Sequence, residues 1–177
     1  VDAVRLARLL PPDGVYVDFA EIPRTDFIRQ VPGGMHYAAF VVVPGGPELV
    51  RLLDIAEGDA LDALVGGYLK EMKKKAAGLP DHDPSRLEGY AVQLYRRLLE
   101  PLLPYLSGGK KLYVSPDGLL NLIPLEVLKD DRGRYAVEDH AIHYVTSGRD
   151  LARFGDAAAP AGRAVIIADP DFDLPQT

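Results

Sequence analysis

Residues 37–43, Tyr-Ala-Ala-Phe-Val-Val-Val, form a nearly continuous run of apolar and β-branched side chains. A run of this length and composition is typical of a strand that is covered on both faces of a sheet. The Pro-Gly-Gly-Pro turn at 44–47 follows, and residues 48–55 are expected to return as an antiparallel partner. Alternating apolar and polar residues over 15–22 predict a further strand before this pair.

A spacing of 3.6 residues between apolar side chains predicts the helices. The predicted helices are a short amphipathic one over 1–10 and two longer ones over 59–76 and about 85–99. Ser85 and Glu88 have the spacing of a capping box at the start of the last helix. Residues 23–34, which are polar and contain Pro and Gly, are interpreted as a loop.

The second half of the chain alternates short strands with short helical segments. We predict strands over 111–114, 119–123 (pairing back on its neighbour), 140–145 and 165–168, and helical segments over 124–128 and 150–154. Residues 157–162, rich in Ala and Gly, form a small-residue linker. This order predicts an α/β fold with a mixed sheet, two longer helices and short connecting helices.

The composition excludes several classes of protein. The 177 residues contain 20 Lys and Arg against 26 Asp and Glu, a net charge of −6, which argues against direct nucleic-acid binding. The longest apolar runs fall far short of the ~20 residues of a membrane span, and no signal peptide is visible, so we expect a cytoplasmic location and no membrane partner. Without cysteine, these residues contain no disulfide, thiolate zinc site or cysteine nucleophile.

The strongest local candidate for chemistry is a carboxylate cluster, Asp169, Asp171 and Asp173, that follows the strand over 165–168. Ligands of α/β proteins bind at this end of a strand. Asp169 and Asp171 therefore leave open a Mg²⁺-dependent hydrolase, although Pro170 intervenes and no second acidic cluster follows. A solvated loop or pocket rim is the alternative, and no cofactor or metal is expected.

The other polar motifs do not make this chain an enzyme. His140 and His143 are three residues apart in a β-type run, which places them on opposite faces and argues against a shared metal. Ser107, Ser115 and Ser147 lie outside a Gly-x-Ser-x-Gly elbow, and the last two suit a turn and a helix cap.

Four linked stretches together resemble a known family. They are residues 10–19 (Leu-Pro-Pro-Asp-Gly-Val-Tyr-Val-Asp-Phe), 37–43 with the turn after them, 112–126 (Leu-Tyr-Val-Ser-Pro-Asp-Gly-Leu-Leu-Asn-Leu-Ile-Pro-Leu-Glu), and 143–151 (His-Tyr-Val-Thr-Ser-Gly-Arg-Asp-Leu) leading to 168–172 (Ala-Asp-Pro-Asp-Phe). In this order they resemble the N-terminal half of a CHAT domain. CHAT domains are caspase-like cysteine proteases related to separase, often attached to TPR repeats and expected here in a bacterial protein.

The resemblance implies that this chain is inactive by itself. Family members use a His–Cys dyad, in which His assists a thiolate nucleophile, and both residues follow the Ala-Asp-Pro-Asp-Phe segment. Residues 1–162 would then be a pseudo-protease-like part, and 163–177 the first strand and loop of an incomplete caspase-like core. The implied partners are the catalytic half, a protein or peptide substrate, and TPR or sensor domains.

By the same resemblance, loops after the first core strand shape the specificity pocket of caspase-like enzymes. Asp169, Asp171 and Asp173 are therefore expected to bind substrate and to favour Arg or Lys side chains. The alternatives are a stand-alone regulatory or protein-binding module and the Mg²⁺-dependent hydrolase described above.

Overall fold

A computed structural model of the chain describes residues 2–26, 31–45, 50–106 and 111–153. The helices are α1 (Ala3–Leu9), α2 (Gly58–Ala76), α3 (Pro84–Leu98), α4 (Ala136–Asp139) and α5 (Gly148–Arg153). The strands are β1 (Gly14–Asp26), β2 (Val31–Val42), β3 (Val50–Glu57), β4 (Lys111–Ser115) and β5 (Ala141–Tyr144). Short 3-10 helices are η2 (Glu100–Tyr105), η3 (Gly118–Leu122) and η4 (Leu125–Val127).

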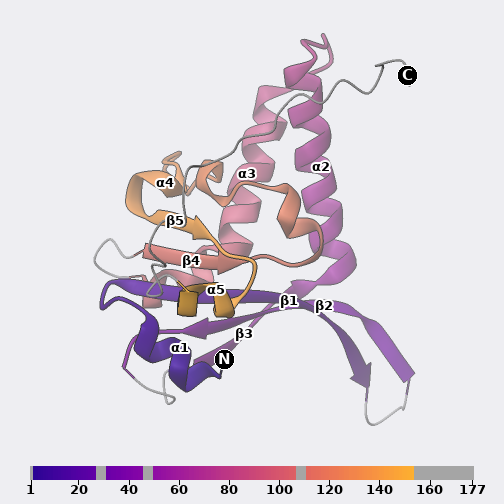
Figure 1. The fold of residues 1–177 in the computed structure, drawn as a ribbon. Helices are drawn as coiled ribbons and strands as arrows, with labels where there is room; N and C mark the ends of the chain where they lie inside the picture. The colour runs from indigo at the N-terminus through magenta and orange to yellow at the C-terminus, as the bar shows by residue number, and fades with distance from the viewer. Residues whose placement is uncertain (1, 27–30, 46–49, 107–110, 154–177) are drawn as a thin grey trace, which may run out of the picture.

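The strands form one mixed sheet in the order β3-β2-β1-β4-β5 (Figure 1). β1, β2 and β3 are antiparallel neighbours, whereas β4 is parallel to both β1 and β5. Each parallel pair needs a crossover connection, which is provided by α2 and α3 before β4 and by η3, η4 and α4 before β5. The predicted α/β fold with a mixed sheet is therefore confirmed.

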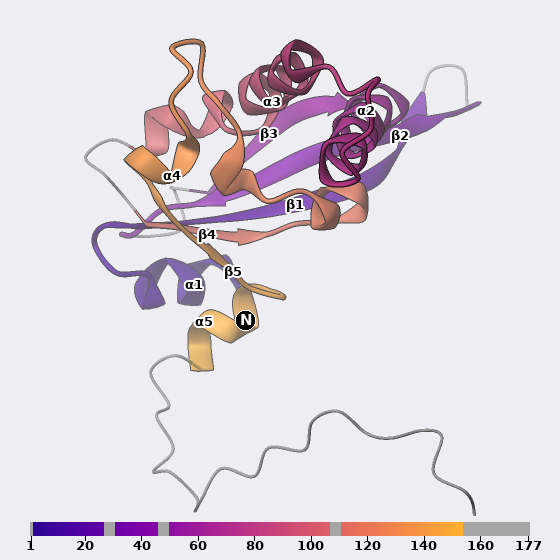
Figure 2. The same cartoon turned by 90° about the horizontal axis from the view of Figure 1, so that it is seen from above.

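Helices cover the two faces of the sheet unequally (Figure 2). α2 and α3 lie over one face and enclose the larger core, which includes Val17, Val41 and Leu94. The short helices α1 and α5 lie over part of the other face and enclose a smaller core. The run at 37–43 is consequently covered on both faces only in part, because the side chain of Phe40 is 39% exposed.

The loop predicted over residues 23–34 is wrong. β1 continues to Asp26 and β2 begins at Val31, so most of this segment is a two-stranded arm that runs out beyond the other strands (Figure 1). β4 pairs only with the first part of β1, so the missing N–H of Pro23 leaves no ladder partner unpaired on that side. A register shift between Pro23 and Arg24 absorbs the remaining irregularity.

The strand predicted over residues 119–123 is also wrong, because this segment is the 3-10 helix η3. The carboxylate of Asp117 accepts hydrogen bonds from the N–H groups of Gly118 and of Glu21, which lies far away in sequence. Gly118 has a φ of 54°, a left-handed conformation that turns the chain away from a strand. These contacts bend the chain after β4.

The capping box predicted from Ser85 and Glu88 is not formed. α3 begins one residue earlier, at Pro84, and Asp83 caps it by accepting from the N–H groups of Ser85 and Arg86. Proline suits the first helical position, where no N–H is needed. Glu88 instead forms an ion pair with Lys129 at 2.7 Å.

Candidate docking edge at strand β5

β3 and β5 are the two edge strands of the described sheet, and they differ in the number of charged side chains that oppose pairing with another strand. β3 carries the charged residues Arg51, Asp54 and Glu57 along its length. β5 reads Ala-Ile-His-Tyr and has no carboxylate, lysine or arginine. Because charged side chains on an edge strand oppose the addition of a further strand, β5 is the less protected edge.

β5 is held in a defined register against β4, from Lys111 opposite Ala141 to Val114 opposite Tyr144. The imidazole ring of His143 stacks on the ring of Tyr113, with centroids 5.1 Å apart and planes inclined by 22°. Ile142 packs against the larger core, while the other three side chains of β5 are exposed. Among the described residues no strand pairs with the outer edge of β5, and packing on the inner side fixes the position of β5.

Tyr144 anchors the carboxyl end of β5. Its hydroxyl accepts a hydrogen bond from the N–H of Leu125 at 2.7 Å and donates one to Oε2 of Glu126 at 2.8 Å. Although Tyr144 as a whole is exposed, partial burial of its hydroxyl, together with the nearby Glu126 carboxylate, raises the pKa of Tyr144 above its ordinary value, whereas the Leu125 N–H acts in the opposite direction. The hydroxyl therefore stays protonated and links β5 to η4.

The loop after β5 is closed by two side chains. The buried Ser115 hydroxyl donates to the carbonyl oxygen of Thr146 at 3.2 Å. The carboxylate of Asp150 accepts from the N–H groups of Thr146 and Ser147, at 2.9 and 3.2 Å. Ser115 and Ser147 therefore have structural roles, since the Ser147 hydroxyl accepts from the N–H of Arg149.

A cavity of about 650 Å³ opens at the carboxyl ends of β4 and β5. This is the end of a parallel sheet at which α/β proteins bind ligands. The described side chains around it include Asn121, Leu122 and Tyr144, but no carboxylate, imidazole or lysine. Among the described residues, this cavity therefore offers no general base that could activate a nucleophile.

The histidines near β5 are separate in the structure. His143 stacks on Tyr113, whereas His140 precedes the strand and is partly buried, with no hydrogen-bond partner for its Nδ1 among the described residues. Burial lowers the pKa of His140, although the neighbouring Asp139 opposes this shift. Within the described ranges, no group of three His, Asp or Glu residues is placed to hold a metal ion.

Asp169, Asp171 and Asp173, the residues expected to bind substrate, lie outside the described residues, as do Ser107 and the strand predicted over 165–168. Their placement therefore remains a prediction. In the described part of the chain, no helix has the length and apolar character needed to cross a membrane.

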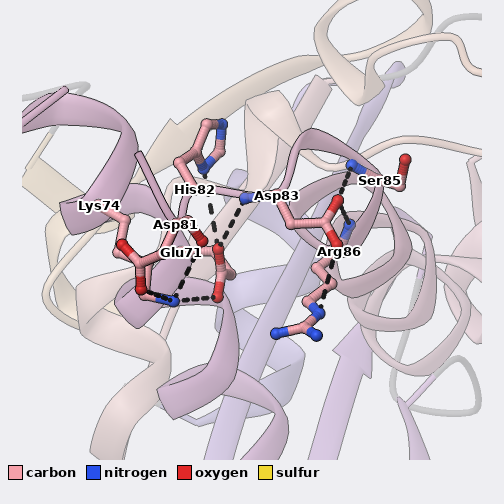
Figure 3. A network of polar contacts seen from close by, with 7 residues as sticks. All are labelled: Glu71, Lys74, Asp81, His82, Asp83, Ser85 and Arg86. Atoms are coloured by element: carbon pink, nitrogen blue, oxygen red, sulfur yellow. Dashed lines mark hydrogen bonds and ion pairs between the residues drawn. The ribbon is translucent and has the colours of Figure 1, made fainter. Parts of the chain in front are cut away.

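A buried polar network between α2 and α3 was missed by the sequence analysis (Figure 3). The side chain of Glu71 is only 5% exposed, and its carboxylate accepts from Lys74 Nζ at 3.2 Å and from the Asp83 N–H at 3.4 Å. His82 Nδ1 lies 3.7 Å from the same carboxylate. The sequence does contain a signal for the burial of Glu71, because Glu71 follows Tyr68 by three residues and therefore lies on the same, buried face of the helix.

Comparison with known proteins adds one finding. A family model described as CHAT domain matches residues 88–177, which among the described elements include β4, β5, α4 and α5. No curated protein matches the chain. The β5 edge and the residues that hold it in place lie inside the matched stretch. The chain therefore belongs to the CHAT domain family of caspase-like peptidases.

Proposed function

We propose that this chain is the non-catalytic N-terminal portion of a CHAT-type cysteine peptidase and that it scaffolds a half bearing the His–Cys dyad. That half belongs to the same gene product or to a companion polypeptide. The observation that carries the proposal is the uncharged edge of β5, with which no described strand pairs. It is supported by the composition, because 177 residues without cysteine contain no thiol nucleophile.

The edge of β5 accepts a further parallel strand in this proposal. Parallel pairing requires a crossover, and α5 follows β5 on the face opposite α2 and α3 (Figure 2). In the assembled peptidase, the apolar stretch at 165–168, which comes next in the sequence, is the added strand, and binding of the His–Cys half on its far side fixes it against β5. Residues 163–177 thereby begin the protease core, while residues 1–162 form the pseudo-protease-like scaffold.

The first experiment compares the chain alone with the chain joined to the His–Cys half. Material verified by mass spectrometry to contain only residues 1–177 is expected to leave a peptide library uncleaved and to resist a cysteine-reactive acyloxymethyl ketone probe. Adding the half that carries the dyad is expected to produce cleavage and labelling of a cysteine in that half. Peptide cleavage by the verified single chain would contradict the proposal.

A second experiment tests the edge itself. His143→Lys places a charge on β5 and is expected to weaken binding of the His–Cys half by about tenfold or more, because the charge opposes strand addition. Leu52→Lys is the matched control, since Leu52 is 62% exposed on the opposite edge strand. Calorimetry on variants with wild-type circular dichroism measures both affinities, and equal losses would contradict docking at β5.

Asp169, Asp171 and Asp173 are proposed to contribute negative charge to the substrate pocket of the assembled peptidase. Replacing all three with Ala is expected to lower kcat/KM for substrates with Arg or Lys before the scissile bond, relative to neutral substrates. The same ratio in wild type and variant would remove these residues from the specificity pocket.

A further inference from the structure

A groove of about 550 Å³ lies between the α2–α3 pair and the segment from η4 to α4, and none of its lining residues belongs to β5. Its lining is mainly apolar and includes Tyr68, Met72, Leu87, Val127, Tyr135 and Val137. The side chains of Met72, Val127, Tyr135 and Val137 are between 37% and 56% exposed. Such a concentration of exposed apolar side chains is characteristic of a binding surface.

Both walls of the groove are held in place by polar contacts. On one side, the Glu71 network fixes the connection between α2 and α3 (Figure 3). His82, which lies in this connection, lines the groove. On the other, Lys129 and Tyr135 form an isolated β-bridge, and the Lys129 ammonium lies 5.0 Å from the centroid of the Tyr135 ring. A pre-formed surface of this kind loses little conformational entropy on binding.

The formal charges that line the groove balance, with Lys75 and Lys129 against Glu88 and Glu126, but only one of the two lysines is paired. Glu88 is paired with Lys129 at 2.7 Å, and Glu126 accepts the Tyr144 hydroxyl. Lys75 also lines the groove and has no ion-pair partner among the described residues. A bound segment with a carboxylate near Lys75 would match this charge.

The walls of the groove also restrict which backbone conformation a bound peptide segment can have. The lining residues come from helices, turns and the isolated bridge, and none belongs to a strand of the sheet. An extended peptide would therefore find no sheet edge to pair with here, whereas a helix satisfies its own backbone hydrogen bonds. We propose that this groove binds an amphipathic helical segment of a partner protein, with apolar side chains in the groove and a carboxylate beside Lys75.

The test uses the whole chain and a displayed library of randomised peptides of about 15 residues, a length that can form a helix. Selected peptides are expected to have apolar residues at positions i, i+3 or i+4, and i+7, together with Asp or Glu. Val137→Asp and Lys75→Glu are each expected to weaken their binding by about tenfold or more. Enrichment of no peptide, or of peptides without an acidic residue, would overturn the proposal.

Two control variants separate this groove from the other surfaces of the chain. Leu52→Asp changes an exposed leucine on β3 and is expected to leave peptide affinity unchanged. His143→Lys, which blocks the β5 edge, is also expected to leave it unchanged, so the groove and the docking edge are tested independently. Loss of peptide binding in His143→Lys would overturn the assignment to the groove.

Sedimentation measures whether a second copy of the chain fills the groove instead. The wild-type chain is expected to remain monomeric at concentrations where the selected peptides bind. A concentration-dependent dimer that Val137→Asp abolishes would overturn the proposal of a helical partner segment.

Discussion

The hydroxyl of Tyr37 connects three separate parts of the fold. This fully buried side chain of β2 donates to Oδ1 of Asp62 on α2 at 3.0 Å and accepts from the N–H of Leu119 on η3 at 3.3 Å. Tyr37→Phe leaves both partners without this hydroxyl. It is expected to lower the free energy of unfolding, measured in urea, by about 1–2 kcal/mol. Tyr95→Phe is the control, because Tyr95 is also buried and its hydroxyl has no hydrogen-bond partner among the described residues. A cost in Tyr95→Phe as large as in Tyr37→Phe would contradict this reasoning.

The same hydroxyl predicts a dependence of stability on alkaline pH. Burial, with Asp62 and Glu21 nearby, raises the pKa of Tyr37 from 10.0 to about 12, although the Leu119 N–H opposes the shift. A raised pKa in the folded state contributes stability below the unfolded value, and this contribution is lost as the pH rises from 10 toward 12. The difference in unfolding free energy between wild type and Tyr37→Phe is therefore expected to shrink over that range. A constant difference would contradict the raised pKa.

Glu71 predicts the opposite dependence, on acidic pH. Burial of its carboxylate opposes ionisation, but the hydrogen bonds from Lys74 and the Asp83 N–H, with the charges of Lys74 and Arg86, lower the pKa of Glu71 below 4.5. Stability from a lowered pKa is present above the unfolded value and is lost as the pH falls through the folded one. Glu71→Gln is expected to have a lower melting temperature than wild type at pH 7. The difference between the two melting temperatures is expected to be smaller at pH values well below 4.5. A difference in melting temperature that does not change with pH would mean that Glu71 is not ionised in the folded chain.

Within α2, two neighbouring glycines have different surroundings. A Cβ atom at Gly66 would meet nothing within 4 Å, whereas one at Gly67 would lie 2.5–2.8 Å from the ring and hydroxyl of Tyr90 on α3. Gly66→Ala is expected to stabilise the chain by about 0.5–1 kcal/mol, because alanine has the higher helix propensity. Gly67→Ala is expected to gain less or to lose stability, since Tyr90 must move. Denaturant unfolding of both variants measures the difference, and equal gains would contradict the close contact between α2 and α3.

For the molecule as a whole, the proposed scaffold role predicts a pattern of hydrogen exchange. Amides of β5 are expected to exchange faster than those of β1, which lies between two strands. Binding of the His–Cys half is expected to slow exchange in β5 and to leave β3, at the opposite edge, unchanged. Mass spectrometry of peptic fragments measures exchange in both strands. Protection of β3 instead of β5 would show that the half docks at the opposite edge and would contradict the proposal.

Local patterns in the sequence determined much of this molecule. The two long helices were predicted within a residue or two, because a stripe of apolar side chains depends only on spacing along the chain. The α/β class, the absence of cysteine and the resemblance to CHAT domains were likewise available from the residues alone, and the family match at 88–177 agrees. The helix start at Pro84 was missed because Asp83 and Ser85 are both good caps, and only the backbone geometry distinguishes them.

Contacts between distant residues decided the rest. The hydrogen bonds from the Glu21 N–H to Asp117 and from the Leu119 N–H to the Tyr37 hydroxyl join segments more than eighty residues apart. With these bonds, residues 119–123 become a 3-10 helix instead of a strand. The strand order that leaves β5 at an edge also depends on long-range pairing. The apolar groove has the same origin, since its walls come from helices and turns that meet only after folding. The spacing of residues predicts which side faces a core, but packing alone determines which elements meet there and which of the described strands lie at the edges of the sheet.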